Sequence, residues 1–374
     1  MKADRSIGRS GLARVWGLIV TGALLGACGA TLADSPSRVL PKLMDRSTVK
    51  AIDLGLNYLA KTQRRDGSWL NQGGYGSYPE VMTSLAGLAL MGGGSTPHSG
   101  PYSREVRRAM GFILRTAEKN SQGLICGNSG QTMYAHGFGM LFLATCYGGE
   151  GDEETEKRFK KVLTRAVEVT GAAQSKPGGS SPGGGWYYTP TSGSDEGSVT
   201  VTQLQALRAC RNAGIKVDKQ IIDKAVKYLK YCQNGDGGIS YSASSRGSSR
   251  PAISAAAVAC FYSAGIYDRE TGGKGMEAQM VEKLVKYVKN HVTVDRGGGY
   301  SGYYFYTHMY MAQAMYMRGG RDWKSYYPQL SQALRTMQAP DGSWNGDNIG
   351  TTYGTAIAGI ILQLPYGYLP IVQR

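Results

Sequence analysis

The feature that most constrains the fold is a seven-residue segment that occurs near each end of the chain. Gln63–Trp69 and Gln338–Trp344 both read Gln-x-x-Asp-Gly-Ser-Trp. Each segment follows an amphipathic stretch and precedes an apolar one, which is the pattern of two helices joined by a turn. A supersecondary unit that recurs along a chain predicts a fold built by stacking hairpins.

The first hairpin shows the pattern most clearly. Ile52, Leu56 and Leu59 recur at helical spacing on a helix that ends near Gln63. A second, apolar helix is predicted at about 79–91. This order of an amphipathic helix, a Gly-rich turn and an apolar helix defines the repeat unit.

Four looser copies lie between the two best-formed hairpins. Three of them keep part of the turn, as Gly184-Gly185-Trp186, Gln233 with Asp236-Gly237-Gly238, and Gly297-Gly298-Gly299-Tyr300. Their first helices are predicted to start near Glu105, Glu156, Asp218 and Met276, and their second helices near Tyr134, Ser198, Pro251 and Tyr306. The chain is therefore predicted to hold six repeats.

The two helices of a repeat differ in solvent exposure. In the fourth repeat the first helix has one lysine-rich face, whereas its partner at 253–263 is apolar nearly all round and must be covered. Six half-exposed helices outside six covered ones describe an all-α fold, an α6/α6 toroid over residues 48–370. An open solenoid is the alternative, but its end repeats should be polar caps, and here they are the best-formed copies. The longest loop is predicted at 171–197, and its length favours a functional or disordered segment.

The first 33 residues have the features of an export signal. A basic stretch precedes an apolar run, 15–27, that is short for a membrane-spanning helix. Leu25-Gly26-Ala27-Cys28 resembles a bacterial lipoprotein signal with Cys28 as the lipidated residue, whereas Thr31-Leu32-Ala33 would suit cleavage before Asp34. The sequence thus predicts an exported protein, either in the cell envelope (as a lipoprotein or periplasmic protein) or outside the cell, with a linker at 34–47.

The chain is basic, with a formal net charge of +15. Its Lys and Arg residues are spread over amphipathic helices and form no block, and together with the export signal this argues against nucleic acid as a partner. An anionic lipid or polysaccharide surface is a more suitable partner for this positive charge than nucleic acid. A solvated basic surface without a specific partner is the simpler interpretation.

The Gln63–Trp69 and Gln338–Trp344 segments resemble the repeats of the squalene cyclase family, whose Gln-Trp motifs have this form. The resemblance covers about 45–370 and implies a single ring of the terpene cyclase and protein prenyltransferase type. Tyr134-Ala135-His136-Gly137 and Arg250-Pro251-Ala252 are similar to segments of small secreted prenyltransferase and squalene-oxidase repeat proteins. Because toroids of this kind also include carbohydrate lyases and hydrolases, the fold alone does not fix an activity.

The motifs of the family's enzymes are matched poorly. Proton-initiated cyclases carry Asp-x-Asp-Asp-Thr, and the only candidate is Ser194-Asp195-Glu196-Gly197-Ser198, where Glu196 would replace the acid. The same acidic residues could simply cap a helix. Prenyltransferases of this fold hold zinc with an Asp two residues before a Cys, and no cysteine here has one. We therefore expect neither a metal nor a cofactor.

Topology nevertheless predicts a pocket, because the inner helices of a toroid start around one opening. Convergent polar side chains in a concave site are the usual sign of a binding site. We predict three catalytic candidates, which are Glu196, His136 and His308, and seven ligand-binding candidates, which are Tyr78, Glu80, Tyr134, Asp195, Arg250, Tyr306 and Tyr353. Glu196 is expected to be ionised, since a helix N-terminus favours a carboxylate.

The sequence thus favours an exported, squalene cyclase-like toroid that binds a small molecule or glycan in its central cavity. The ligand is expected to be either a lipid or isoprenoid, or a carbohydrate. One alternative is an enzyme of the same fold, as a carbohydrate lyase or hydrolase or a divergent terpene cyclase. Another is a structural protein of the envelope. Membrane attachment would follow from lipidation of Cys28.

Overall fold

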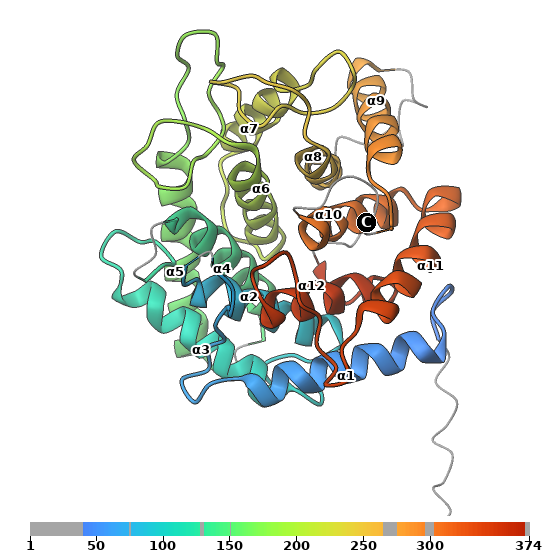
Figure 1. Cartoon of the computed structure of the whole chain (residues 1–374). Helices are drawn as coiled ribbons and strands as arrows, with labels where there is room; N and C mark the ends of the chain where they lie inside the picture. Colours follow the sequence, from blue (N-terminus) through green and yellow to red (C-terminus); the bar gives the residue numbers. More distant parts are fainter. Residues whose placement is uncertain are drawn as a thin grey trace, which may run out of the picture. The chain divides into compact units, whose positions relative to one another are not determined.

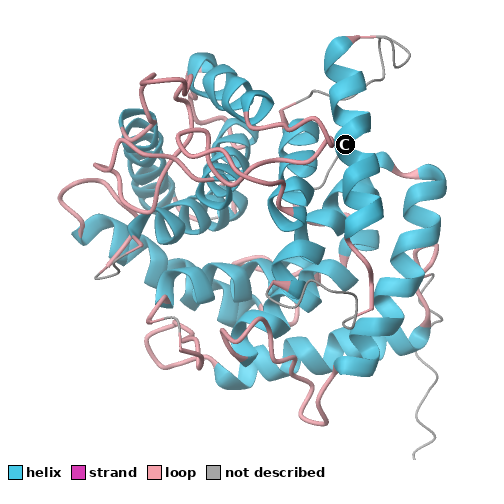
Figure 2. Ribbon diagram, turned by 45° about the horizontal axis from the view of Figure 1, so that its top comes forward, coloured by secondary structure: helices cyan, strands magenta, loops and turns pink. Residues whose placement is uncertain are grey.

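The computed structural model describes residues 40–74, 76–127, 131–149, 151–264, 275–295 and 303–370. The predicted export signal and the fifth-repeat turn at 297–300 lie outside the described residues. Leu40–Arg374 forms one compact unit, which holds every helix of the described residues. The described residues form helices and loops without strands (Figure 2).

Helices follow one another in pairs along the described part of the chain. The first helices of the pairs are α1 (Arg46–Thr62), α3 (Ser103–Lys119), α5 (Glu153–Ala172), α7 (Lys219–Tyr231), α9 (Met276–His291) and α11 (Gly320–Met337). The second helices are α2 (Pro79–Gly92), α4 (Thr132–Cys146), α6 (Gly197–Asn212), α8 (Pro251–Ser263), α10 (Tyr304–Arg318) and α12 (Thr351–Leu362). A 3-10 turn, η1 (Leu364–Tyr366), follows the last helix. All eight predicted starts in the middle repeats fall within three residues of these bounds.

The second helices pack against one another in a closed order. Helix α2 contacts α4, and the contacts continue through α6, α8, α10 and α12 back to α2. The first helices lie outside this ring, each against the second helix of the preceding repeat, with α1 against α12 (Figure 1). The predicted α/α toroid of six repeats is therefore confirmed.

Burial separates the two rings as the sequence pattern predicts. Nearly every residue of α8 is buried, whereas α7 buries only Ala225, Val226, Tyr228 and Leu229. An inner helix has other helices on most sides, so apolar or small residues are needed all round it. The outer helices keep one charged face in water.

The turn segments of the repeats join neighbouring outer helices through one side-chain amide. The Nε2 of Gln63 donates to the carbonyl oxygen of Gly67 in its own turn, at 3.0 Å, and to that of Glu105 in α3, at 2.9 Å. The Nε1 of Trp69 donates to the carbonyl oxygen of Leu59 at 2.9 Å, and the indole is buried. Each motif thus fixes the end of its own outer helix and the start of the next.

The third and fourth repeats use the same geometry. Gln174 donates to the carbonyl oxygens of Gly184 and Ile221, both at 2.9 Å, although a longer loop separates it from Trp186. Gln233 donates to those of Gly237 and Met280, both at 3.0 Å. Sequence reasoning missed the role of Gln174 because the insertion hides its spacing from Trp186.

A glycine is required where these turns meet the next outer helix. Gly67 has φ +95°, and a Cβ there would lie 2.2 Å from the carbonyl oxygen of Arg108 in α3. Gly342 repeats this arrangement against Leu54 of α1, with φ +90° and 2.5 Å. Both the positive φ and the close approach exclude any other residue without strain.

The loops also hold the N-termini of the inner helices, each loop acting on the preceding repeat. The carbonyl oxygen of Tyr188 accepts from Met133 N at the start of α4, and that of Tyr241 accepts from Gly197 N at the start of α6. The carboxylate of Asp347 accepts from the amides of Phe305 and Tyr306 in α10, at 3.1 and 3.0 Å. Loop residues therefore lie at the N-terminal ends of the inner helices, where the predicted site residues are also located.

Candidate functional site: tyrosines around a buried glutamate

Glu196 is the N-cap residue of α6 and is only 1% exposed. Its carboxylate accepts from the amides of Ser198 and Val199, at 3.0 and 2.6 Å, and from the Ser198 hydroxyl at 2.7 Å. Burial raises the pKa of Glu196, and the hydrogen bonds from Ser198, Val199 and Tyr241 only partly oppose this rise. The helix N-terminus favours the carboxylate, as expected from the sequence, but the loss of hydration on burial outweighs the N-terminal donors, so the pKa lies above its ordinary value.

Five tyrosines lie close enough to Glu196 for its charge to act on their hydroxyls. Burial raises the pKa of each phenol, and the Glu196 carboxylate contributes to every one of these shifts. We call this group the tyrosine cluster, and it consists of Tyr134, Tyr188, Tyr241, Tyr306 and Tyr310. Its members come from α4, α10 and the loops before α6 and α8.

The tyrosines of the cluster range from exposed to fully buried. Tyr241 is 38% exposed, Tyr134, Tyr188 and Tyr306 are half-buried, and Tyr310 is fully buried. The Tyr188 and Tyr241 hydroxyls hydrogen-bond to each other, and the Tyr134 hydroxyl bonds to that of Ser198. Aromatic faces and hydroxyl groups are thus available at the surface and continue inward past Glu196.

The hydroxyl of Tyr306 has no hydrogen-bond partner among the described residues, although it is buried. Asp347 fixes the backbone of Tyr306, and the ring lies 4.9 Å from that of Tyr310. A buried polar atom that forms no hydrogen bond costs about 1–3 kcal/mol. Because the Tyr306 side chain is held in place, its hydroxyl can form a hydrogen bond with a polar group of a ligand.

Below the cluster, a polar pair bridges two inner helices. The Nε2 of Gln205 in α6 donates to the Oε1 of Gln313 in α10 at 2.8 Å, and both side chains are buried. Gln205 lies seven residues after Ser198, or about 10 Å along the helix. The interior of the ring is therefore polar at this depth, as it is at the level of Glu196.

The two predicted catalytic histidines are held at contacts between inner and outer helices. The Nδ1 of His136 accepts from Ile125 N at 3.0 Å, and its Nε2 contacts the carbonyl oxygen of Ala166 and the hydroxyl of Thr170 in α5. His308 accepts from the Tyr326 hydroxyl of α11 at 2.6 Å, while its Nε2 faces the Thr293 carbonyl oxygen. Burial lowers the pKa of both imidazoles to about 4, so both are neutral at pH 7. The structure does not bring them together with Glu196.

The side chains of two other predicted residues also bind elsewhere, and a third is exposed. The Oδ1 of Asp195 accepts from Ser242 Oγ and Ala243 N of the loop before α8, at 2.9 and 2.7 Å. The Oε1 of Glu80 accepts from Gly127 N at 2.9 Å, and Arg250 is exposed at the start of α8. The hydrogen bonds of these residues therefore do not join them to the histidines in the single constellation that was predicted.

Of the remaining predicted residues, Tyr134 and Tyr306 belong to the cluster and Tyr353 borders it. Tyr353 is buried beside Asp347 and Tyr310, which both raise its pKa in addition to burial. Tyr78 instead donates to the Oε1 of Gln131 at 3.0 Å. Sequence reasoning missed Tyr188 and Tyr241, yet a signal was present. Each lies two residues after the buried residue that ends its turn, Trp186 or Ile239.

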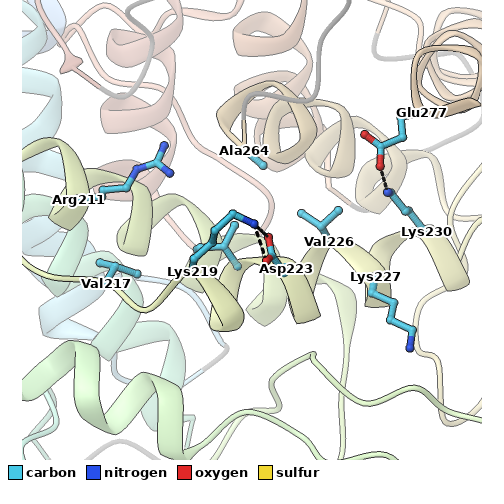
Figure 3. A pocket seen from close by; sticks show the side chains of 10 residues that line it. Arg211, Val217, Lys219, Asp223, Val226, Lys227, Lys230, Ala264 and Glu277 are labelled. Carbon is cyan, nitrogen blue, oxygen red and sulfur yellow. Dashed lines mark hydrogen bonds and ion pairs between the residues drawn. The ribbon is translucent and has the colours of Figure 1, made fainter. Parts of the chain in front are cut away.

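A separate pocket of about 580 Å³ lies on the outer wall, lined by residues of α7 and the ends of neighbouring helices (Figure 3). Lys219 pairs with Asp223 within α7, and Lys230 of α7 pairs with Glu277 of α9. Its rim residues Ala264 and Glu277 flank segment 265–274, which lies outside the described residues. We therefore do not take this pocket as the site.

Two further features are limited to the described part of the chain. Its helices include none with both the length and the apolar character needed to span a bilayer. Within the same ranges, no group of three or more His, Cys, Asp or Glu side chains is arranged to hold a metal ion.

Sequence comparison finds no matching family model and no similar curated protein. Structure comparison identifies the fold: the chain has the α/α-toroid fold found in a terpene cyclase and in a mannanase. It is similar to the type II terpene cyclase MstE from Scytonema in its apo form, with a TM-score of 0.53 and 13% identity over 86% of this chain and 99% of that one. It is also similar to the GH76A alpha-1,6-mannanase from Salegentibacter sp. HEL1_6, with a TM-score of 0.60 and 10% identity over 86% and 99%. At such identities the likeness shows the fold alone.

Both neighbours have been solved with organic ligands. The cyclase is described in complex with geranylgeranyl dihydroxybenzoate, with a TM-score of 0.54 and 13% identity over 86% of this chain and 98% of that one. An inactive mannanase variant is described in complex with alpha-1,6-mannotetrose, with a TM-score of 0.60 and 11% identity over 86% and 99%. A toroid that binds a ligand fits both comparisons.

Proposed function

We propose that this protein binds a carbohydrate at the tyrosine cluster around Glu196. The observation that carries the proposal is that five tyrosines from four segments lie near one buried carboxylate, and that the Tyr306 hydroxyl among them has no hydrogen-bond partner in the described residues. Tyrosine faces stack on sugar rings, and the hydroxyls and the carboxylate match sugar hydroxyl groups.

The chemistry of the interior favours a sugar over an isoprenoid. An isoprenoid chain would need an apolar lining, because each unpaired polar group buried against hydrocarbon costs free energy. Here Glu196, Thr202 and the Gln205–Gln313 pair follow one another inward, and all four side chains are buried. A polyhydroxylated ligand can form hydrogen bonds with such groups.

The choice between the two ligand classes can be tested by calorimetric titration. The purified protein would be titrated with neutral oligosaccharides, including alpha-1,6-mannotetraose, and with a geranylgeranyl alcohol in matched detergent. Saturable heat with a sugar and none with the alcohol is expected. The opposite result would replace the proposal with isoprenoid binding, and no saturable heat with either would favour a structural role.

Glycoside hydrolysis is a second candidate, and one observation favours it. The raised pKa of Glu196 is typical of a general acid. Glycosidases commonly use a second carboxylate across the scissile bond, however, and the side chain of neighbouring Asp195 is bound to the loop before α8. Chromatography of the titrated oligosaccharide would distinguish the two, since binding alone leaves its length unchanged.

We also propose export, on the basis of the basic and apolar stretches at 1–27 and the small residues that follow. The Leu25–Cys28 segment supports a lipid anchor on Cys28. Cys28→Ser should then block processing or release the protein from the membrane fraction. Recovery of a mature N-terminus at Asp34 from the wild-type protein would overturn lipidation while leaving export intact.

A further inference from the structure

Four successive outer helices carry a basic residue at one equivalent position. Arg108 of α3, Lys224 of α7 and Lys283 of α9 each place a backbone carbonyl against the turn glycine of the preceding repeat. Arg165 of α5 packs against Gly123 through its side chain instead, and it precedes Gln174 by the same spacing as Lys224 precedes Gln233. We call these four residues the cationic belt. The equivalent residue of α1 is Leu54. In α11 it is Gln329, which precedes Gln338 by the same spacing as Leu54 precedes Gln63.

The belt is held in place and is not neutralised by carboxylates. Arg108 and Arg165 donate to the carbonyl oxygens of Arg64 and Ser121 in the preceding turns, bonds that leave the positive charge intact. Lys224 and Lys283 are exposed. Among the described residues, no carboxylate forms an ion pair with any of the four.

Several acidic side chains on the outer wall form ion pairs with basic residues of a neighbouring helix. Glu118 of α3 pairs with Arg158 of α5, Glu277 of α9 with Lys230 of α7, and Asp322 of α11 with Lys289 of α9. Each described outer helix still has more basic than acidic residues. The additional lysine Lys227 projects from α7 away from the Lys219–Asp223 pair of the same helix (Figure 3).

The shape of the belt restricts its partner. Its four members lie on consecutive helices of a closed outer ring, so they face different directions, and a flat bilayer could meet only one or two at a time. A flexible anionic chain can follow all four. Single-stranded nucleic acid gains affinity by stacking on aromatic side chains. The exposed large hydrophobic side chains of the described residues include no aromatic on α3, α5, α7 or α9.

We propose that the cationic belt binds an anionic polysaccharide along the outer wall. Charge complementarity over four repeats provides the attraction, and release of counterions makes it dependent on salt. This surface is separate from the tyrosine cluster, and the proposal does not depend on carbohydrate binding there.

The test compares two sets of charge-removing substitutions in the full chain. The belt variant carries Arg108→Gln, Arg165→Gln, Lys224→Gln and Lys283→Gln. The control variant carries Lys50→Gln, Lys61→Gln, Arg321→Gln and Lys324→Gln, which removes the same charge from exposed residues of α1 and α11. Binding of fluorescent polygalacturonate is followed by anisotropy at low and at raised salt. If the two arginines prove necessary for folding, Lys224→Gln with Lys283→Gln is compared with Lys50→Gln with Lys324→Gln.

The belt variant should bind at least tenfold more weakly than the wild type, with a shallower salt dependence, while the control loses less than threefold. Equal losses in the two variants would overturn the proposal, because binding would then follow net charge alone. Stronger binding of the wild type to vesicles of anionic phospholipid, or to single-stranded RNA, than to polygalacturonate would also overturn it.

Discussion

The side-chain amide of Gln338 donates a 2.9 Å hydrogen bond to the carbonyl oxygen of Ala51, which joins the last repeat to the first outer helix. The same nitrogen donates to the Gly342 carbonyl oxygen of its own turn, also at 2.9 Å. Closure of the ring therefore uses the same contact that joins neighbouring repeats elsewhere.

Gln338→Leu should destabilise the protein by about 2 kcal/mol, because it leaves two carbonyl oxygens without this donor. Gln332→Leu, at an exposed position of α11, the helix that Gln338 caps, serves as the control and should change the free energy of unfolding by less than about 0.5 kcal/mol. Urea denaturation measures both. Similar losses in the two variants would mean that the closing contact does not stabilise the ring.

His308 should contribute to stability in a pH-dependent way. Its folded-state pKa is about 4, below its ordinary value of 6.5, so between these values the unfolded chain binds the proton more tightly. Stability is therefore lost as the pH falls from 6.5 towards 4, by on the order of 2–3 kcal/mol for this group. His308→Gln should flatten the pH profile of the melting temperature and leave ligand affinity unchanged. His98→Gln, at an exposed position, should alter neither.

Glu196 should show the opposite dependence. Its folded-state pKa is raised above its ordinary value of 4.5, so its protonated form is favoured by folding. Stability from this group is complete below pH 4.5 and is lost as the pH rises from 4.5 through the folded-state value. Relative to the Glu196→Gln variant, the wild type should therefore lose melting temperature as the pH increases from 4 to 8. A relative gain over that range would indicate that the helix N-terminus dominates after all.

The repeats were predictable because the Gln-x-x-Asp-Gly-Ser-Trp motif occurs twice without change, at Gln63–Trp69 and Gln338–Trp344. The apolar character of α8 on all sides also indicated an inner ring of covered helices. The candidate site was predictable only in part. Tyr134 and Tyr306 follow from their place at helix starts, whereas His136 occupies a similar position and points to α5. The direction of a side chain depends on the helix rotation and on its partners, which sequence spacing does not fix. Tyr188 and Tyr241 lie in loops, where periodicity carries no information.

Carbohydrate binding at the tyrosine cluster can be tested with Tyr306→Phe. The substitution removes one hydroxyl that has no partner among the described residues, so it should leave the melting temperature unchanged or slightly higher. Affinity for the bound oligosaccharide, measured by calorimetry, should fall about fivefold or more, as for a lost hydrogen bond of about 1 kcal/mol. Tyr316→Phe, ten residues further along α10, should leave the affinity unchanged. Unaltered affinity in Tyr306→Phe, or an equal fall in both variants, would contradict the account.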